Sequence, residues 1–432
     1  MQLVHDAVRA IGGEAAVRGA RALTLRGTGE GIVLGQNRSP DSDPLRYRIV
    51  SFERSTEMQK GQWRQEQVLQ SLFRRQNPAL ETEITALDGR LAFDVRDGKP
   101  VRQSESVARD RRVEVRHSPL GILQAALAPG SVVANRRRVG GFEAVDVRPP
   151  DGGVFILSID PSTRLPVKVS SMTNETVLGD VVVETEFADY RETSGLKLPT
   201  RIISRLDGTA LATLHVGSAI VNGPVSDLEA PATVRSAPIA PSAPNVTAEE
   251  LSKGVWLLGG SSHRSLLVEF GDHLLLVEAP WDEARTFAVI AKARALVPSK
   301  PLTHVVSTHH HFDHVGGLRA AVSEGRIRAL ELVRRQDPRR QFEFGCGRIV
   351  DARVGVGVAQ DGSWRLTQAR RDVAGAAGGQ DGEAPSSTHE CPELLIPESG
   401  HTHASQVSRK PLAFPALGRV SKSRKSVRGS LF

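Results

Sequence analysis

Residues 303–317, THVVSTHHHFDHVGG, join an apolar strand pattern to four histidines and an aspartate, with a pair of glycines behind them. The apolar half reads as a strand buried in a sheet, so the polar half lies at its carboxyl end. In open α/β sheets this edge is where ligand crevices form. No other stretch limits the fold as strongly, because it requires a layered sheet whose binding chemistry gathers beyond one strand end.

The residue types in this cluster are those of a metal site. His309, His311 and His314 offer neutral imidazole nitrogens, which suit zinc and similar metals, and Asp313 adds a hard oxygen. At the end of this strand His309 and His311 point the same way, since side chains repeat every two residues. The turn that follows can direct Asp313 and His314 toward a second metal, and two metals at about 3.5–4 Å can hold a hydroxide between them.

The same alternation separates other polar side chains from the cluster. His310 points away from its neighbours and is expected to be packed or solvated, and His304 belongs to the strand interior. Gly316 and Gly317 let the backbone pass close to the site and open the following helix. We therefore expect the metal chemistry at four positions of this turn.

The residues before the cluster predict the rest of an α/β layer. GVWLLGG, SLLVEFG and HLLLVEAP are short apolar runs between residues 254 and 280, each typical of a strand. Residues 282–300 form an amphipathic helical pattern, and another strand follows at residues 302–308. This order of strands and helix predicts a layered domain over residues 247–330.

The spacing HxHxDH between an apolar strand and GG, after two strands and a helix, resembles the signature of the metallo-β-lactamase-fold metallo-hydrolase superfamily. The resemblance extends over about residues 247–325 and implies the first half of an αββα domain. It implies that His309 and His311 bind the first metal. It also implies that Asp313 and His314 bind the second, with Asp313 orienting the attacking water.

For a protein of this superfamily the expected cofactor is zinc, as one or two ions, and the expected chemistry is hydrolysis by metal-bound hydroxide. The expected partner is a small-molecule ester, lactone, lactam or thioester, selected by the loops around the site. The family's acidic residue at the end of the second strand, usually Asp, corresponds to Glu278. His263 lies on a loop that could line the site, and Trp281 could wall the substrate pocket or pack elsewhere.

The residues after Gly325 depart from the pattern of the family. A complete site would need a third histidine for the first metal, a bridging carboxylate and a final histidine for the second. The later histidines are His389, His401 and His403, and no apolar strand leads into the GHTH of residues 400–403. We therefore expect an incomplete second metal site, with His401 and His403 as weak candidates for further ligands.

Residues 331–432 are rich in Arg, Gly and Ala and carry little strand or helix periodicity. They predict an irregular, poorly ordered basic tail, of the composition that a reading-frame shift in a GC-rich gene or a replaced C-terminus would produce. Two interpretations of the chain follow. It is a metal-dependent hydrolase, or it is a catalytically impaired remnant whose other domain binds an apolar ligand.

The first half of the chain predicts that other domain. Residues 1–226 hold a short helical pattern and then many β-rich runs, separated by Asp-Gly turn signals such as those at 88–89 and 207–208. Strands so closely spaced favour an antiparallel sheet, and residues 104–128 favour helix. The Pro- and Ala-rich residues 227–246 predict an extended linker to the second domain, so the predicted fold class is α+β.

The run FADYRETSGLKLPTRIIS, residues 187–204, with the β-rich stretches around it, resembles lipoprotein-carrier-type β-sheet domains. Such domains have a curved antiparallel sheet that cups apolar ligands, and they imply an exported protein. The first residues, MQLVHDAVRAIGG, show no signal-peptide pattern, which would instead predict a cytoplasmic location.

The net charge of the chain is +7, and residues 326–432 carry all of the excess, with 18 Lys and Arg against 11 Asp and Glu. The basic clusters there have no recognition motif and no interleaved aromatic residues, so we expect no specific nucleic-acid partner. No apolar run approaches the roughly 20 residues of a membrane span. Two cysteines give no disulfide framework, and the sequence does not indicate an oligomeric state.

Overall fold

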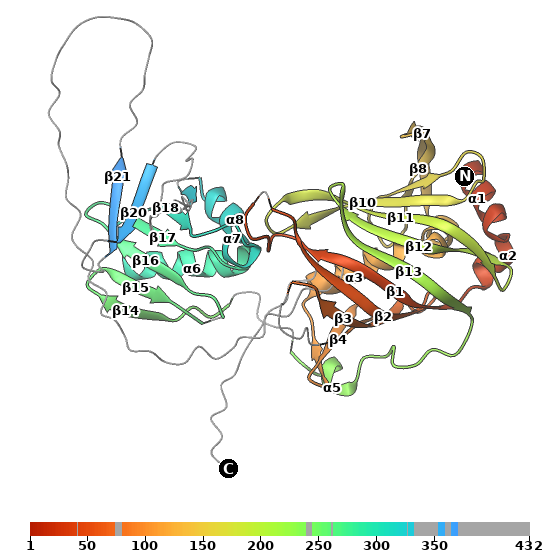
Figure 1. The fold of residues 1–432 in the computed structure, drawn as a ribbon, viewed down its shortest axis with the longest axis horizontal. Helices are drawn as coiled ribbons and strands as arrows, with labels where there is room; N and C mark the ends of the chain where they lie inside the picture. Colours follow the sequence, from red (N-terminus) through yellow and green to blue (C-terminus); the bar gives the residue numbers. More distant parts are fainter. Residues whose placement is uncertain are drawn as a thin grey trace, which may run out of the picture. The chain divides into compact units, whose positions relative to one another are not determined.

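A computed structural model describes residues 1–40, 42–73, 80–238, 244–260, 262–325, 327–331, 353–358 and 364–369 (Figure 1). These residues divide into two compact units, with the boundary between residues 238 and 244. Each unit has a hydrophobic core of its own. Within the described ranges, no helix is both long enough and apolar enough to cross a membrane.

The first unit is built on one sheet of thirteen described strands, in which all neighbours are antiparallel. Two meanders, β1 to β6 and β7 to β13, are joined by the pairing of β1 with β13 (Figure 1). The predicted antiparallel sheet is therefore confirmed. Its strands are β1 (Ala22–Val33), β2 (Leu45–Glu57), β3 (Gln62–Ser71), β4 (Leu80–Asp88), β5 (Leu91–Arg96), β6 (Lys99–Arg102), β7 (Val132–Val139), β8 (Phe142–Arg148), β9 (Phe155–Ile159), β10 (Pro166–Glu175), β11 (Gly179–Thr193), β12 (Leu196–Leu206) and β13 (Thr209–Val221).

Asp-Gly pairs close two of the hairpins in this sheet. Asp97 and Gly98 connect β5 to β6 with φ angles of 50° and 71°. Asp207 and Gly208 connect β12 to β13 with φ angles of 45° and 80°. Two successive residues with positive φ give a turn whose twist matches that of the flanking strands. The turn signals in the sequence thus set the positions of these hairpins.

Helices pack against the sheet of the first unit and bury its apolar face. Helix α1 contacts β12, α3 contacts β4 and β5, and α4 contacts β8 and β10. In α1 the buried residues Leu3, Val4, Ala7, Val8 and Ile11 recur at helical spacing and join the main core. The unit's own helices therefore bury parts of the sheet, with α1, α2 and α4 in the main core and α3 and α5 in smaller clusters. They are α1 (Gln2–Ile11), α2 (Glu14–Gly19), α3 (Glu105–Arg116), α4 (Pro119–Ala126) and α5 (Ala232–Arg235).

The helical pattern at residues 104–128 forms two helices, α3 and α4, with a break at His117 and Ser118. The Oγ of Ser118 accepts a hydrogen bond from the amide of Gly121 at 3.1 Å and so caps α4. Pro119 occupies the first turn of α4, where its missing N–H removes no helical hydrogen bond. The capping residues therefore explain why one apolar pattern forms two helices.

The break between these helices buries His117 in the first unit. Its Nε2 lies 2.8 Å from Oγ of Ser171 in β10, and its Nδ1 lies 3.1 Å from Oγ1 of Thr185 in β11. The ring also makes an edge contact with Phe155. Burial lowers the pKa of His117 to about 4, because the charged form loses its hydration there.

The expected linker over residues 227–246 is not extended throughout its length. Leu228, Ala230 and Val234 are buried in the first unit, and α5 lies within this segment. The amide of Ala230 donates a hydrogen bond to Oδ2 of Asp88 at 2.9 Å. The first unit therefore extends past residue 226, because apolar side chains in this segment pack against its sheet.

The second unit contains a mixed sheet in the order β14-β15-β16-β17-β18-β19. The pairs from β14 to β17 are antiparallel, whereas β18 is parallel to both β17 and β19. The predicted order of apolar strands, helix and strand is confirmed. The elements are β14 (Ala248–Ser252), β15 (Val255–Leu258), β16 (Ser265–Glu269), β17 (Leu274–Val277), α6 (Glu283–Leu296), β18 (Leu302–Ser307), α7 (Phe312–Val315), α8 (Leu318–Ser323) and β19 (Arg328–Glu331).

Two further described strands, β20 (Arg353–Val358) and β21 (Trp364–Ala369), pair antiparallel with each other. They lie within residues 331–432, which the sequence predicts to be irregular, so the prediction misses this pair. The alternation of valine and glycine in β20 is a strand signal that the overall composition obscures. Most other residues of this segment lie outside the described ranges.

Strand β17 carries apolar residues on both faces of the second sheet. Leu274 and Leu276 belong to the main core with Val289 of α6. Leu275, between them, belongs to a separate cluster with Val306 of β18. Since side chains alternate along a strand, the central strands are apolar on both sides, as expected for a sheet held between two layers. Helix α6 belongs to one of these layers.

The turn from α7 into α8 passes close to the loop that follows β17. A Cβ added at Gly316 would lie 2.0 Å from the carbonyl oxygen of Trp281, and one at Gly317 would lie 1.7 Å from Oγ1 of Thr286 in α6. The amide of Gly317 also donates to the carbonyl of Ala279 at 2.9 Å. The glycine pair therefore permits a close approach of the backbone to the loop after β17 and to α6.

The first unit is expected to lose stability as the pH falls from about 6.5 to about 4. Because the pKa of His117 in the folded unit is about 4, the unfolded chain, where histidine titrates near 6.5, takes up the proton first. Stability that is fully present above pH 6.5 should fall by up to about 3 kcal/mol through this range. Hydrogen exchange of first-unit peptides, measured in denaturant at several pH values, reports the change.

His117→Gln should make this pH dependence shallower, because glutamine does not titrate and can still hydrogen bond to Ser171 or Thr185. The matched control is His215→Gln, since His215 is exposed on β13. In the control, the stability of the first unit should change with pH as steeply as it does in the wild-type protein. Identical slopes for all three proteins would contradict this account of His117.

Gly316→Ala should destabilise the second unit by about 1–3 kcal/mol, the usual range for forcing an atom into a packed site. The added Cβ would meet backbone atoms, which cannot rotate out of its way. Gly271→Ala is the matched control, because a Cβ there meets nothing within 4 Å. Hydrogen exchange of peptides covering residues 302–325 measures the difference, and equal protection in both variants would argue against the close approach.

Candidate metal centre

The histidine cluster begins just beyond β18, which stops at Ser307. Residues 308–311 form an irregular turn, and α7 starts at Phe312. The Oγ of Ser307 donates a hydrogen bond to the carbonyl of His309 at 2.9 Å, which bends the chain out of the strand. The alternation of a strand therefore does not govern where the histidine side chains point.

The turn nevertheless brings the imidazole rings together. The ring centroids of His309 and His314 are 4.1 Å apart, and those of His309 and His311 are 4.5 Å apart. The rings of His310 and His311 are also close, at 4.9 Å. The expectation that His310 points away from its neighbours is wrong, because the extended conformation ends before it is reached.

Burial and crowding together disfavour the charged form of His309. The pKa of His309 is lowered to about 4, first because burial removes hydration and then because His314 and His311 lie close by. His309 is therefore neutral at neutral pH. The neutral imidazole is the form that binds metal ions.

Glu278 connects the end of β17 to the cluster. It is buried and has a φ of 72°, which is uncommon for a residue with a side chain. Its Oε1 accepts a hydrogen bond from the amide of Thr308 at 2.8 Å, and its Oε2 accepts one from Nδ1 of His314. Burial opposes ionisation of Glu278, but these hydrogen bonds outweigh it and lower its pKa. The His314 ring is thereby held with its lone pair on Nε2.

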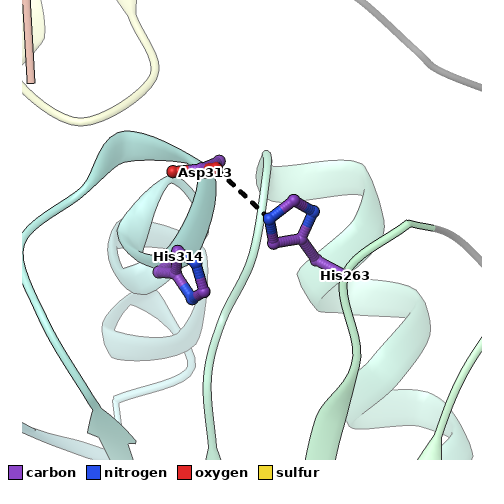
Figure 2. Close-up of side chains that lie close together, drawn as sticks. All are labelled: His263, Asp313 and His314. Atoms are coloured by element: carbon purple, nitrogen blue, oxygen red, sulfur yellow. Dashed lines mark ion pairs between the residues drawn. The ribbon is translucent and has the colours of Figure 1, made fainter. Parts of the chain in front are cut away.

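His263 reaches two of the predicted ligands from the loop between β15 and β16. Its Nε2 lies 3.2 Å from Oδ2 of Asp313, and its ring centroid lies 5.0 Å from that of His314. One candidate ligand atom from each of the three residues lies within 4.8 Å of the others. Figure 2 shows His263 approaching from one side, and Asp313 and His314 from α7 on the other.

Trp281 lies beside this group. Its ring makes an edge contact with the ring of His263 at a centroid distance of 4.9 Å, and its amide donates to the carbonyl of Asp313 at 3.3 Å. Like Glu278, it has a positive φ, of 70°. Such strained backbone persists only where the surrounding structure fixes it. The indole therefore has a defined position next to two candidate site residues.

Other polar residues considered from the sequence lie elsewhere or are not described. His304 lies within β18, as predicted, and its ring is 5.5 Å from that of His273, which precedes β17. His401 and His403 lie outside the described residues. The sequence pattern gives no signal for Thr308, whose backbone amide donates to Glu278 and whose Oγ1 lies 3.0 Å from Nδ1 of His309.

The donor set in this region suits a zinc ion. Imidazole nitrogens and a carboxylate oxygen are common zinc ligands, at about 2.0–2.2 Å. His263, Asp313 and His314 supply two such nitrogens and one oxygen. His309 brings a further imidazole next to His314, and His311 brings one next to His309. The side chains of His263, Asp313 and His314 are 15–24% exposed, so an ion can reach them from solvent. The residues present therefore fit the metal.

Comparison with known families agrees with the motif. Residues 258–389 match the model of the metallo-beta-lactamase superfamily. The match includes His263 and the whole histidine cluster. It also continues past Gly325, so the family pattern extends further along the chain than the resemblance found at residues 247–325.

The chain is similar to a solved metallo-beta-lactamase from Hirschia baltica, with 27% identity, 20% of this chain and 43% of that chain covered, and a TM-score of 0.19. It is also similar to FIM-1 from Pseudomonas aeruginosa in a mono-zinc form, with 29% identity, 21% of this chain and 44% of that chain covered, and a TM-score of 0.19. A third similar structure is a LolA superfamily protein from Nitrosomonas europaea, with 12% identity, 52% of this chain and 94% of that chain covered, and a TM-score of 0.31. The chain spans less than half the length of these two metallo-beta-lactamases. The similarity of this chain to the metallo-beta-lactamase superfamily therefore rests on the match of residues 258–389.

Proposed function

We propose that the second unit is a zinc-dependent hydrolase of the metallo-beta-lactamase superfamily. The observation that carries the proposal is the gathering of His309, His311 and His314 beside Asp313 beyond the carboxyl end of β18. The pKa of His309 is lowered to about 4, so its imidazole is in the neutral form that binds a metal cation. The family match of residues 258–389 supports the same function.

We assign roles to four side chains of this turn and to Glu278. His309 and His311 hold one metal ion, and Asp313 and His314 hold a second. When bound, zinc supplies Lewis acidity and lowers the pKa of a coordinated water to about 7. Asp313 accepts a hydrogen bond from the attacking water and so orients it. Glu278 keeps the His314 ring in position through its hydrogen bond to Nδ1.

The proposed substrate is a carbonyl compound with a leaving group, namely an ester, lactone, lactam or thioester. In all four, water attacks the carbonyl carbon and the bond to the leaving group then breaks. One arrangement of metal ligands and water-orienting carboxylate can therefore serve each of them. The loops that carry His263 and Trp281 border the site, and we propose that they contribute to the choice among substrates.

The second interpretation is a chain with an incomplete metal site, whose first unit binds an apolar ligand. In the first unit, however, helices α1 and α4 contribute to the main core against the sheet. Because the unit's own helices already bury this apolar face of the sheet, it does not favour an open cavity for an apolar ligand. The hydrolase is therefore the function that we propose.

The function can be tested on the full chain after removal of metal with a chelator and reconstitution with zinc. A chromogenic lactam, a lactone, an ester and a thioester are assayed in parallel. Asp313→Ala should lower kcat/KM by at least about 100-fold on whichever compound is hydrolysed, since it removes a positioned proton acceptor. His273→Ala is the matched control, because His273 lies at the opposite end of β17 from Glu278, and it should keep wild-type activity.

Two outcomes would count against the proposal. Failure of the zinc-loaded wild-type chain to hydrolyse any of the four compounds would favour the impaired remnant. Equal activity of Asp313→Ala and His273→Ala would show that Asp313 does not orient the water.

A further inference from the structure

The predicted ligands come from one turn, but a second loop brings another imidazole to them. His263 lies between β15 and β16, and its Nε2 is 3.2 Å from Oδ2 of Asp313. Its ring meets that of His314 edge to face, with the centroids 5.0 Å apart. Figure 2 shows these three side chains pointing toward one another. The spacing of the sequence motif does not account for this third group.

We propose that His263, Asp313 and His314 bind one zinc ion, as a three-residue site that needs no ligand from beyond α7. The inference rests on the proposed function for the choice of metal. It goes further by assigning His263 as a ligand and by closing one metal site within the described residues. Three protein ligands with an open fourth position are the usual arrangement of a catalytic zinc site.

The distances in this group suit a single ion. Ligand atoms at about 2.0–2.1 Å from a tetrahedral zinc are about 3.3 Å from one another. The nitrogen of His263 and the oxygen of Asp313 are already at 3.2 Å. Candidate atoms of all three residues lie within 4.8 Å of one another, so modest side-chain rotation brings them to the required spacing.

Hydrogen bonds hold both imidazoles so that Nε2 is the nitrogen offered to the ion. For His263, Nδ1 lies 3.1 Å from Oγ of Ser262. For His314, Nδ1 donates to Oε2 of Glu278. In metal sites a ligand histidine commonly engages its other nitrogen in this way, which fixes both the tautomer and the ring orientation. Both histidines therefore have the arrangement of a zinc ligand.

A hydrogen bond between His263 and Asp313 would account for the 3.2 Å contact without any metal. The two explanations differ in what glutamine does at this position. His263→Gln can still donate a hydrogen bond to Asp313, but its amide is a poor zinc ligand. His263→Cys loses the imidazole and supplies a thiolate, which zinc binds well.

The test is the zinc affinity of the full chain, measured by competition with a chromogenic chelator under reducing conditions. His263→Gln should weaken zinc binding by at least about 100-fold, the upper end of the effect of losing a group that only supports a ligand. His263→Cys should restore most of the affinity. In the cobalt-loaded protein, His263→Gln should also reduce the visible absorption that reports tetrahedral coordination.

His273→Gln is the matched control for these measurements. The side chain of His273 is 23% exposed, against 24% for His263, and it also hydrogen bonds a neighbouring residue and contacts an aromatic ring. The control should bind zinc within about twofold of the wild-type chain. Thermal unfolding of the metal-free proteins shows whether each variant folds, and His263→Ala, which also lacks a zinc ligand, replaces His263→Gln if the latter does not fold.

The results separate this inference from the proposed function. Zinc affinity in His263→Gln equal to that of His273→Gln would overturn the inference, even if the wild-type chain hydrolyses a substrate. Loss of zinc affinity in His263→Gln with recovery in His263→Cys would support it, even if no substrate is turned over.

Discussion

The carboxylate of Glu278 connects, through hydrogen bonds, the three segments on which the candidate site depends. It lies just after β17, accepts the amide of Thr308 just after β18, and accepts Nδ1 of His314 in α7. Parallel strands end side by side, so one buried side chain can reach both strand ends and the turn beyond them. A carboxylate suits this position because both of its oxygens accept hydrogen bonds, and these bonds keep it charged despite burial.

Most elements of the fold follow from local pattern. Asp-Gly turns at 97–98 and 207–208 and the two-residue period of the strands need no distant partner to be recognised. The residues at which strands and helices end are harder to predict than the elements themselves. Strand β18 stops at Ser307, where a side-chain hydrogen bond to the His309 carbonyl bends the chain, and periodicity does not record such a bond. The segment that holds α5 joins the first unit through tertiary packing, which its proline content conceals.

The candidate site was predictable only where its residues are close in sequence. Asp313 and His314 are recognised by spacing, because the motif and the turn that carries it are one short stretch. The sequence places His263 on a loop near the site, but its contact with Asp313 depends on how the β15–β16 loop lies over α7. That arrangement is set by the register of β15, β16 and β17, which no single stretch of sequence contains.

The hydrogen bond between His314 and Glu278 also limits how metal ions can share the cluster. An imidazole that donates from Nδ1 has one lone pair left, on Nε2, so His314 can bind one ion only. If that ion is the one held with His263 and Asp313, any ion at His309 and His311 must find its other ligands elsewhere. The two metal sites then differ in the number of protein ligands among the described residues. The site of His263, Asp313 and His314 has three, and the site of His309 and His311 has two. Filling should therefore be sequential, with the site of His263, Asp313 and His314 occupied first.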